Sequence, residues 1–150
     1  MFKKILVPLD GSVLAEKALP YAQTLAQKFA GTLLLVQVLP PFVLLPYNDQ
    51  AAEEQLTFLK NAEVMARRYL AHLQADLQES GLTTTIEILE GGPVAEMILE
   101  LARDRAVDVI VMSTHGYTGN ELWIYGSVAN KVLQQAPCPI FLVRAKQGTN

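Results

Sequence analysis

Short apolar runs alternate with longer amphipathic stretches along this chain of 150 residues. The apolar runs are rich in branched side chains and have the length of buried β-strands. The pattern predicts strands over residues Phe2–Leu9, Thr32–Leu39, Thr83–Glu90, Val107–Met112 and Pro139–Arg144. The third run alternates polar and apolar residues, which is typical of a partly exposed edge strand.

The amphipathic stretches carry apolar residues at intervals of three or four, as expected for helices with one buried face. They predict helices from Ser12 to Gly31, from about Ala51 to Ser80, from Pro93 through Ala102, and from Ser127 through Gln135. Alternating strands and helices imply a parallel sheet covered on both faces, and right-handed crossovers make it a doubly wound α/β fold. No linker or internal repeat is visible, so residues 1–150 are expected to form a single domain.

Charge and cysteine content narrow the possible partners. The net charge is −3 and the twelve cationic residues are dispersed, which argues against nucleic acid or an anionic membrane as the main partner. No apolar run approaches the roughly 20 residues needed to span a bilayer. A single cysteine excludes an internal disulfide and a cysteine-based metal site, so a cytoplasmic location is expected.

Two polar segments follow predicted strands. Asp10-Gly11-Ser12 follows the first strand, and Ser113-Thr114-His115-Gly116 follows the fourth. If these strands are central neighbours, both segments flank one crevice at the carboxyl ends of the sheet, where open α/β sheets bind ligands. Gly126-Ser127 adds a helix N-terminus, which favours an anion. A carboxylate facing several N–H groups suits a nucleoside phosphate, although Ser127 serving only as a helix cap is the structural alternative.

Residues for catalysis are scarce. The chain has no Ser-His-Asp set in a recognisable context, no metal-ligand cluster and no lysine in the glycine-rich loop. We therefore expect no catalytic residues. At most, Asp10 beside a nucleotide would bind Mg²⁺ and permit slow hydrolysis.

Two long stretches resemble the universal stress protein family. They are the start, KKILVPLDGSVLAEKALPYAQTLA, and the end, VDVIVMSTHGYTGNELWIYGSVANKVLQQAPCPIFLV. The second is similar to the family signature G-x2-G-x9-G-[ST], which here falls on Ser113, Gly116, Gly126 and Ser127. The likeness covers nearly the whole chain.

The resemblance implies a three-layer sandwich around a five-stranded parallel sheet of order 3-2-1-4-5. It also implies a homodimer paired through the last strand, Pro139 to Arg144. In one branch of the family it implies an adenine nucleotide, with ATP as the leading candidate, bound with or without Mg²⁺. Carried over to this chain, the nucleotide site would consist of Pro8, Asp10, Val38, Met112, Ser113, Gly116, Gly126, Ser127 and Val128.

Two departures from the family pattern bear on the phosphates. Ser113 replaces the first signature glycine, a mild change if the position needs only close packing and a strained one if it needs positive φ. No Lys or Arg occurs between Arg105 and Lys131. A charge-assisted contact contributes about 1.5–3 kcal/mol, so its loss weakens binding roughly 10- to 100-fold. We expect weakened phosphate binding, or a preference for a ligand with fewer phosphates.

The leading hypothesis is a nucleotide-regulated stress-response protein whose 40–50 and 113–127 loops engage unknown protein partners. One alternative is a dimeric interaction protein that binds no nucleotide. The other is a weak ATPase.

Overall fold

The computed structural model describes residues 1–39, 41, 48–115 and 126–145. Its strands form one parallel sheet of order β3-β2-β1-β4-β5, as predicted. The strands are β1 Lys4–Leu9, β2 Thr32–Val38, β3 Thr84–Leu89, β4 Val109–His115 and β5 Ile140–Ala145.

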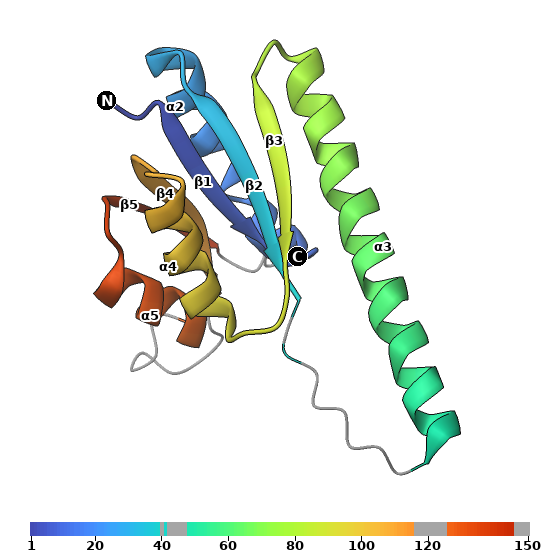
Figure 1. Cartoon of the computed structure of the whole chain (residues 1–150). Coiled ribbons are helices and arrows are strands. Elements are labelled where there is room, and N and C mark those ends of the chain that lie inside the picture. Colours follow the sequence, from blue (N-terminus) through green and yellow to red (C-terminus); the bar gives the residue numbers. More distant parts are fainter. Residues whose placement is uncertain (40, 42–47, 116–125, 146–150) are drawn as a thin grey trace, which may run out of the picture.

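Helices cover both faces of this sheet. They are α1 Val13–Glu16, α2 Leu19–Phe29, α3 Asp49–Glu79, α4 Val94–Asp104 and α5 Ser127–Gln135. Helices α2 and α3 pack on one face and α4 and α5 on the other, which makes the three-layer α/β sandwich expected from the sequence (Figure 1). Among the described residues, no helix is both long enough and apolar enough to cross a membrane.

The alternation of side chains along the central strand divides the apolar core in two. In β1, Ile5 and Val7 point into the core beneath α2 and α3, whereas Leu6 points into the core beneath α4 and α5. All three are fully buried. Burying such a side chain contributes about 1.5–3 kcal/mol, which is why the central strands read as continuous apolar runs.

The single helix predicted from Ser12 to Gly31 is wrong, because the chain forms two helices there. Ser12 caps α1 as predicted, and its hydroxyl accepts a hydrogen bond from the Ala15 N–H at 3.1 Å. Helix α2 then starts afresh with Pro20 in its first turn. A proline inside a continuous helix would lack its N–H and clash with the carbonyl four residues earlier, here that of Glu16.

Gly31 plays a different role from the helix-ending one expected of it. Ala30, with φ 47° and ψ 49°, takes the left-handed conformation that ends α2. A side chain at Gly31 would instead place its Cβ 2.5 Å from the carbonyl oxygen of Phe2. Residue 31 must therefore be glycine, because the backbone just before β1 passes too close to it to leave room for a Cβ.

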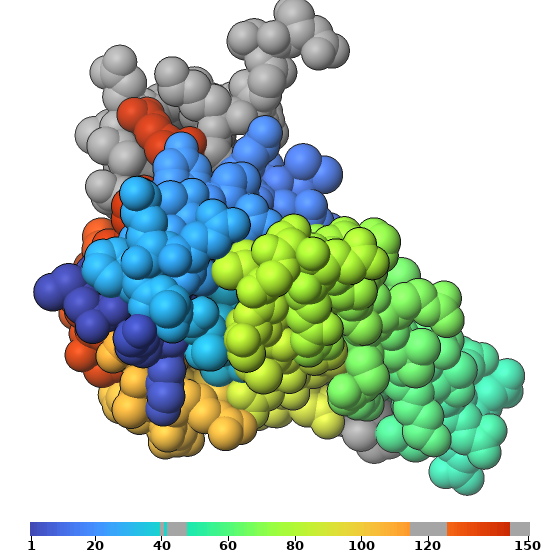
Figure 2. All heavy atoms as spheres, turned by 90° about the horizontal axis from the view of Figure 1, so that it is seen from above, coloured from blue at the N-terminus to red at the C-terminus, as the bar shows by residue number. Residues whose placement is uncertain are grey.

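Helix α3 is the longest element, and its first half projects beyond the sheet (Figures 1 and 2). The side chain of Asn48 caps its start by accepting a hydrogen bond from the Ala51 N–H at 2.7 Å. Its buried residues, Ala66, Leu70 and Leu77, all lie in the second half. Leu56 follows the apolar spacing expected of a buried helix face but is 48% exposed, because the helix there has passed the end of the sheet.

Candidate functional site

A crevice opens where the central strands β1 and β4 part. Their residues pair only at Ile5↔Val109 and Leu6↔Ile110, whereas β1 stays paired with β2 as far as Leu9↔Gln37. Pro8 has no N–H to donate to a sheet ladder. It is still paired with Val36 of β2, whereas the pairing of β1 with β4 has already ended at Leu6.

A cavity of about 420 Å³ lies at this end of the sheet, within the usual size range of small-molecule sites. It collects residues from the ends of β1, β2 and β4 and from the first turns of α4 and α5. Its lining consists of Pro8, Leu9, Asp10, Ala15, Val36, Gln37, Val38, Val94, Ile98, Met112, Ser113, Gly126, Ser127, Val128 and Ala129. Eight of the nine predicted site residues are in this set. The ninth, Gly116, lies outside the described residues, as do the apolar loop 42–47 and most of the 113–127 loop.

Asp10 is held in a tight turn at the end of β1. Its Oδ1 accepts hydrogen bonds from the Ser12 N–H at 2.9 Å and from the Ser12 hydroxyl at 2.6 Å. The Ser12 hydroxyl in turn caps α1. The carboxylate is therefore oriented by the backbone before any ligand arrives, and it remains exposed at the cavity.

Ser113 fits its position without strain. It lies in β4 and is not among the described residues with positive φ. Its hydroxyl donates a hydrogen bond to the carbonyl oxygen of Leu14 in α1 at 2.7 Å. Serine is therefore a mild replacement for the signature glycine here, because the position does not need a positive φ. The Ser113 hydrogen bond also joins the two segments that flank the crevice.

The N-terminus of α5 faces the cavity. Gly126 is its N-cap residue and Ser127 is its first helical residue, with no side-chain cap, so the predicted cap at Ser127 is wrong. The first N–H groups of a helix have no partner within the helix. Ser127, Val128 and Ala129 all line the cavity, and their N–H groups and the helix dipole favour an anion there.

Sequence reasoning missed several lining residues. Val94 and Ile98 come from α4, where their i, i+4 spacing places both on one side of the helix. Gln37 lines the cavity from the end of β2, and its Oε1 is buried without a hydrogen-bond partner. In β4, the Oγ1 of Thr114 is likewise buried without a partner. Unpaired buried polar atoms are costly and mark positions that deserve a functional explanation.

The charges around the cavity are acidic on one side. The Tyr69 hydroxyl donates a hydrogen bond to Glu16 Oε1 of α1 at 3.0 Å. Burial, the hydrogen bond to Glu16 and the charges of Glu16 and Asp10 together raise the pKa of Tyr69. No Lys or Arg is among the described residues that line the cavity.

Metal binding has little support from the protein side chains. Within the described ranges, no group of three or more His, Cys, Asp or Glu residues is placed to hold a metal ion. Asp10 is the one carboxylate among the lining residues that the structure describes. A Mg²⁺ ion there would depend on ligand phosphates for most of its coordination, as Mg²⁺ commonly does.

A second cavity of about 460 Å³ lies at the opposite end of the sheet, beside Lys4, Glu87 and Arg105. Its polar groups are already paired with one another. Arg105 and Glu87 form an ion pair at 2.8 Å, and Lys4 Nζ donates to the Arg105 carbonyl oxygen at 3.0 Å. The carboxyl-end cavity is the better candidate because its N–H donors and carboxylate face open space.

A doubly wound sheet with a polar crevice at its switch point defines an α/β ligand-binding class of domain. Within that class, the model of the universal stress protein family matches residues 1–144, and the chain belongs to this family. It is 34% identical to universal stress protein MJ0531 of Methanocaldococcus jannaschii, over 96% of this chain and 83% of that protein. It is 35% identical to a universal stress protein of Thermus aquaticus, over 96% of this chain and all of the relative.

Solved structures agree with this assignment. The structure of protein MJ0577, a universal stress protein of M. jannaschii, matches with a TM-score of 0.78 and 30% identity over 99% of both chains. Two more distant structures share the fold at 18% and 19% identity and hold ligands. One is a universal stress protein in complex with cAMP (TM-score 0.68, 97% of this chain and 98% of that one), and the other is the Archaeoglobus fulgidus protein in complex with dAMP (TM-score 0.65, 95% and 99%).

Proposed function

We propose that this protein binds an adenine nucleotide, with ATP as the leading candidate, in the carboxyl-end cavity. Nucleotide occupancy would then regulate its part in a stress response. The observation that carries the proposal is the cavity itself, which joins an oriented carboxylate to the N-terminus of α5.

The order of the strands supports a direction for the ligand. Val38 lies at the end of β2, Asp10 at the end of β1, and Ser127 beyond β4 at the start of α5. Neighbouring strands are about 4.8 Å apart, so β2 and β4 are separated by roughly 10 Å. That span suits a nucleoside with its base near Val38, its ribose near Asp10 and its phosphates at α5.

Adenine nucleotides in two relatives with the same fold add support, although those proteins are distant. One carries cAMP and the other dAMP, each with a single phosphate. The described lining residues include no Lys or Arg, which agrees with a site that tolerates ligands of few phosphates.

Calorimetric titration of ATP, with and without Mg²⁺, into nucleotide-free protein tests the proposal. We expect one site per chain. Ser127→Asp should weaken ATP binding about 10-fold, because the new carboxylate repels phosphate at the helix N-terminus while remaining compatible with the helix dipole. Asn130→Asp is the matched control: it adds the same charge to the exposed side of α5, and it should have a smaller effect.

Absence of heat and of thermal stabilisation at millimolar ATP would reject the proposal. The protein would then fit the alternative of an interaction protein with no nucleotide. Phosphate release that depends on Mg²⁺ and is lost in Asp10→Ala would instead favour the weak ATPase.

We further propose a homodimer formed through β5. This strand lies at the edge of the sheet, and exposed apolar edges favour pairing with another chain. Phe141 of β5 packs its ring against Tyr21 of α2, with 5.4 Å between ring centroids, and both remain substantially exposed.

A further inference from the structure

The proposed site has a helix N-terminus for phosphate but no cation among the described residues of its lining. The first cation after Ser127 is Lys131, one turn further along α5. Its Nζ is bound to Glu96 Oε1 of α4. This ion pair therefore bridges the two helices whose first turns line the cavity.

Helix geometry brings Lys131 close to the phosphate end of the cavity. Residues four apart lie on the same side of a helix, and side chains lean toward its N-terminus. Once released from Glu96, the Lys131 side chain would have the reach and the lean to extend along α5 toward Ser127. Lys131 also lies three residues after Val128, another lining residue. Its long flexible chain carries a charge that can turn from one partner to another.

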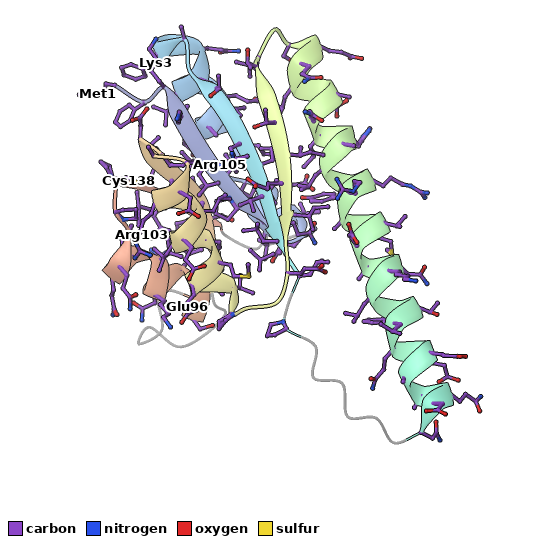
Figure 3. All side chains as sticks on the ribbon, viewed as in Figure 1. Met1, Lys3, Glu96, Arg103, Arg105 and Cys138 are labelled. Carbon is purple, nitrogen blue, oxygen red and sulfur yellow. The ribbon has the colours of Figure 1, made fainter. Side chains whose placement is uncertain are left out.

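Glu96 occupies the matching position on α4. It belongs to the first turn of the helix, between the lining residues Val94 and Ile98. In Figure 3 it lies at the end of α4 that adjoins α5. The positive end of the α4 dipole stabilises its carboxylate.

The pair is exposed enough to exchange partners. The side chains of Lys131 and Glu96 are 42% and 36% exposed. Ion pairs at such positions contribute only about 0–1 kcal/mol. A terminal phosphate carries more charge than one carboxylate and, at the start of α5, has the added attraction of free N–H groups.

We propose that Lys131 is the phosphate-binding cation of this site and that Glu96 holds it when no nucleotide is bound. The Glu96–Lys131 pair then sets how strongly the site prefers several phosphates to one. The inference rests on the proposed nucleotide site and specifies its selectivity. A single phosphate next to the ribose engages the N–H groups of α5, whereas only a longer chain of phosphates reaches Lys131.

Substitution of Lys131 and substitution of Glu96 should change the affinity for ATP in opposite directions. We expect Lys131→Met to weaken ATP about 5-fold and to change AMP by less than about 2-fold. Glu96→Gln should strengthen ATP about 2- to 5-fold, because the carboxylate no longer competes for Lys131. Lys131→Arg should keep most of the preference for ATP over AMP.

If the Glu96–Lys131 ion pair serves only to hold α4 and α5 together, a different pattern is expected. Both substitutions would then lower the melting temperature and weaken ATP and AMP alike. The Arg105–Glu87 pair, which joins the other end of α4 to β3, gives matched controls, and Glu87→Gln and Arg105→Met should leave the ATP-to-AMP ratio unchanged.

The experiment is calorimetric titration of AMP, ADP and ATP into wild type and each variant, with circular dichroism to confirm folding. An unchanged ATP-to-AMP ratio in a folded Lys131→Met variant overturns the inference and leaves the nucleotide site standing. So does weaker ATP binding in Glu96→Gln. If wild type binds none of the three nucleotides, the proposed function and this inference both fall.

Discussion

At the residue scale, two neighbouring hydroxyl groups at the end of β4 have different environments. Ser113 donates its hydrogen bond to Leu14 of α1. Thr114 points to the opposite face, is only 2% exposed, and has no partner for its hydroxyl. Leaving such a group unpaired costs about 1–3 kcal/mol.

Thr114→Val should therefore stabilise the nucleotide-free protein by about 1 kcal/mol, because valine has nearly the same shape and no hydroxyl to satisfy. Urea unfolding of the two proteins measures the difference. Ser113→Ala should show the opposite sign, since it removes a hydrogen bond that is made. A less stable Thr114→Val protein would mean that the hydroxyl has a partner in solution.

Gly31→Ala should destabilise the fold by about 1–3 kcal/mol, since the new methyl group overlaps the Phe2 carbonyl oxygen and the backbone must shift. Thermal and urea unfolding test this expectation. Ala30→Gly is the neighbouring control and should have little effect, because glycine adopts the left-handed conformation of residue 30 readily. If Gly31→Ala and Ala30→Gly lost the same amount of stability, the cause would be a change in the turn as a whole and not the close approach of the Phe2 carbonyl oxygen.

At the scale of elements, the start of β1 is held to the start of β4 by one carboxylate. Asp108 Oδ2 accepts hydrogen bonds from the backbone N–H groups of Lys3 at 2.7 Å and Lys4 at 2.9 Å. The hydrogen bond from the Lys4 N–H makes the largest contribution to holding the pKa of Asp108 below its ordinary value of 3.8. The hydrogen bond from the Lys3 N–H lowers this pKa further. The ionised form is therefore favoured by folding.

Asp108→Asn should lower the stability at neutral pH, and the deficit should shrink in acid. A carboxyl group with a depressed pKa stabilises the fold above its unfolded pKa, and that stability is lost as the pH falls through the folded value. Urea unfolding at pH 7 and near pH 3 tests the sign, with Asp104→Asn, at an exposed position at the end of α4, as the control. A deficit of equal size at both pH values would show that the charge is not involved.

Periodicity in the sequence predicted the type and order of the elements but not all of their limits. The buried strands were recognisable because both of their faces are covered, which makes them continuously apolar. The break before Leu19 was missed because the apolar spacing continues through Pro20, whose effect depends on whether it starts a helix or interrupts one. The exposure of Leu56 was invisible, because it depends on how far the sheet reaches.

At the scale of the whole molecule, most of the candidate site could be placed in advance, because the carboxyl-edge rule follows from topology alone. The order of the strands brings Asp10 and Ser113 together whatever the details of packing. The contributions of Val94 and Gln37 required the placement of α4 and the end of β2 in three dimensions. No local sequence pattern encodes those distances.

The proposed dimer predicts that Phe141→Arg converts a dimer into a monomer, because it replaces the exposed Phe141 ring of β5, which packs against Tyr21 of α2, with a charge. Sedimentation at micromolar concentration measures the change. Val64→Arg is the control, since Val64 is also exposed but lies on α3. A monomeric wild-type protein would rule out this interface.

The overhang of α3 has a consequence for local unfolding. With 31 residues, α3 is about 46 Å long, whereas a strand of 7 residues spans only about 23 Å. Its second half, which contains Leu70 and Leu77, can lose its helical hydrogen bonds only when the core opens. Its first half has little buried surface to lose. Amide protons along this one helix should therefore exchange with solvent in two groups, the early ones through local fraying and the late ones only through global unfolding.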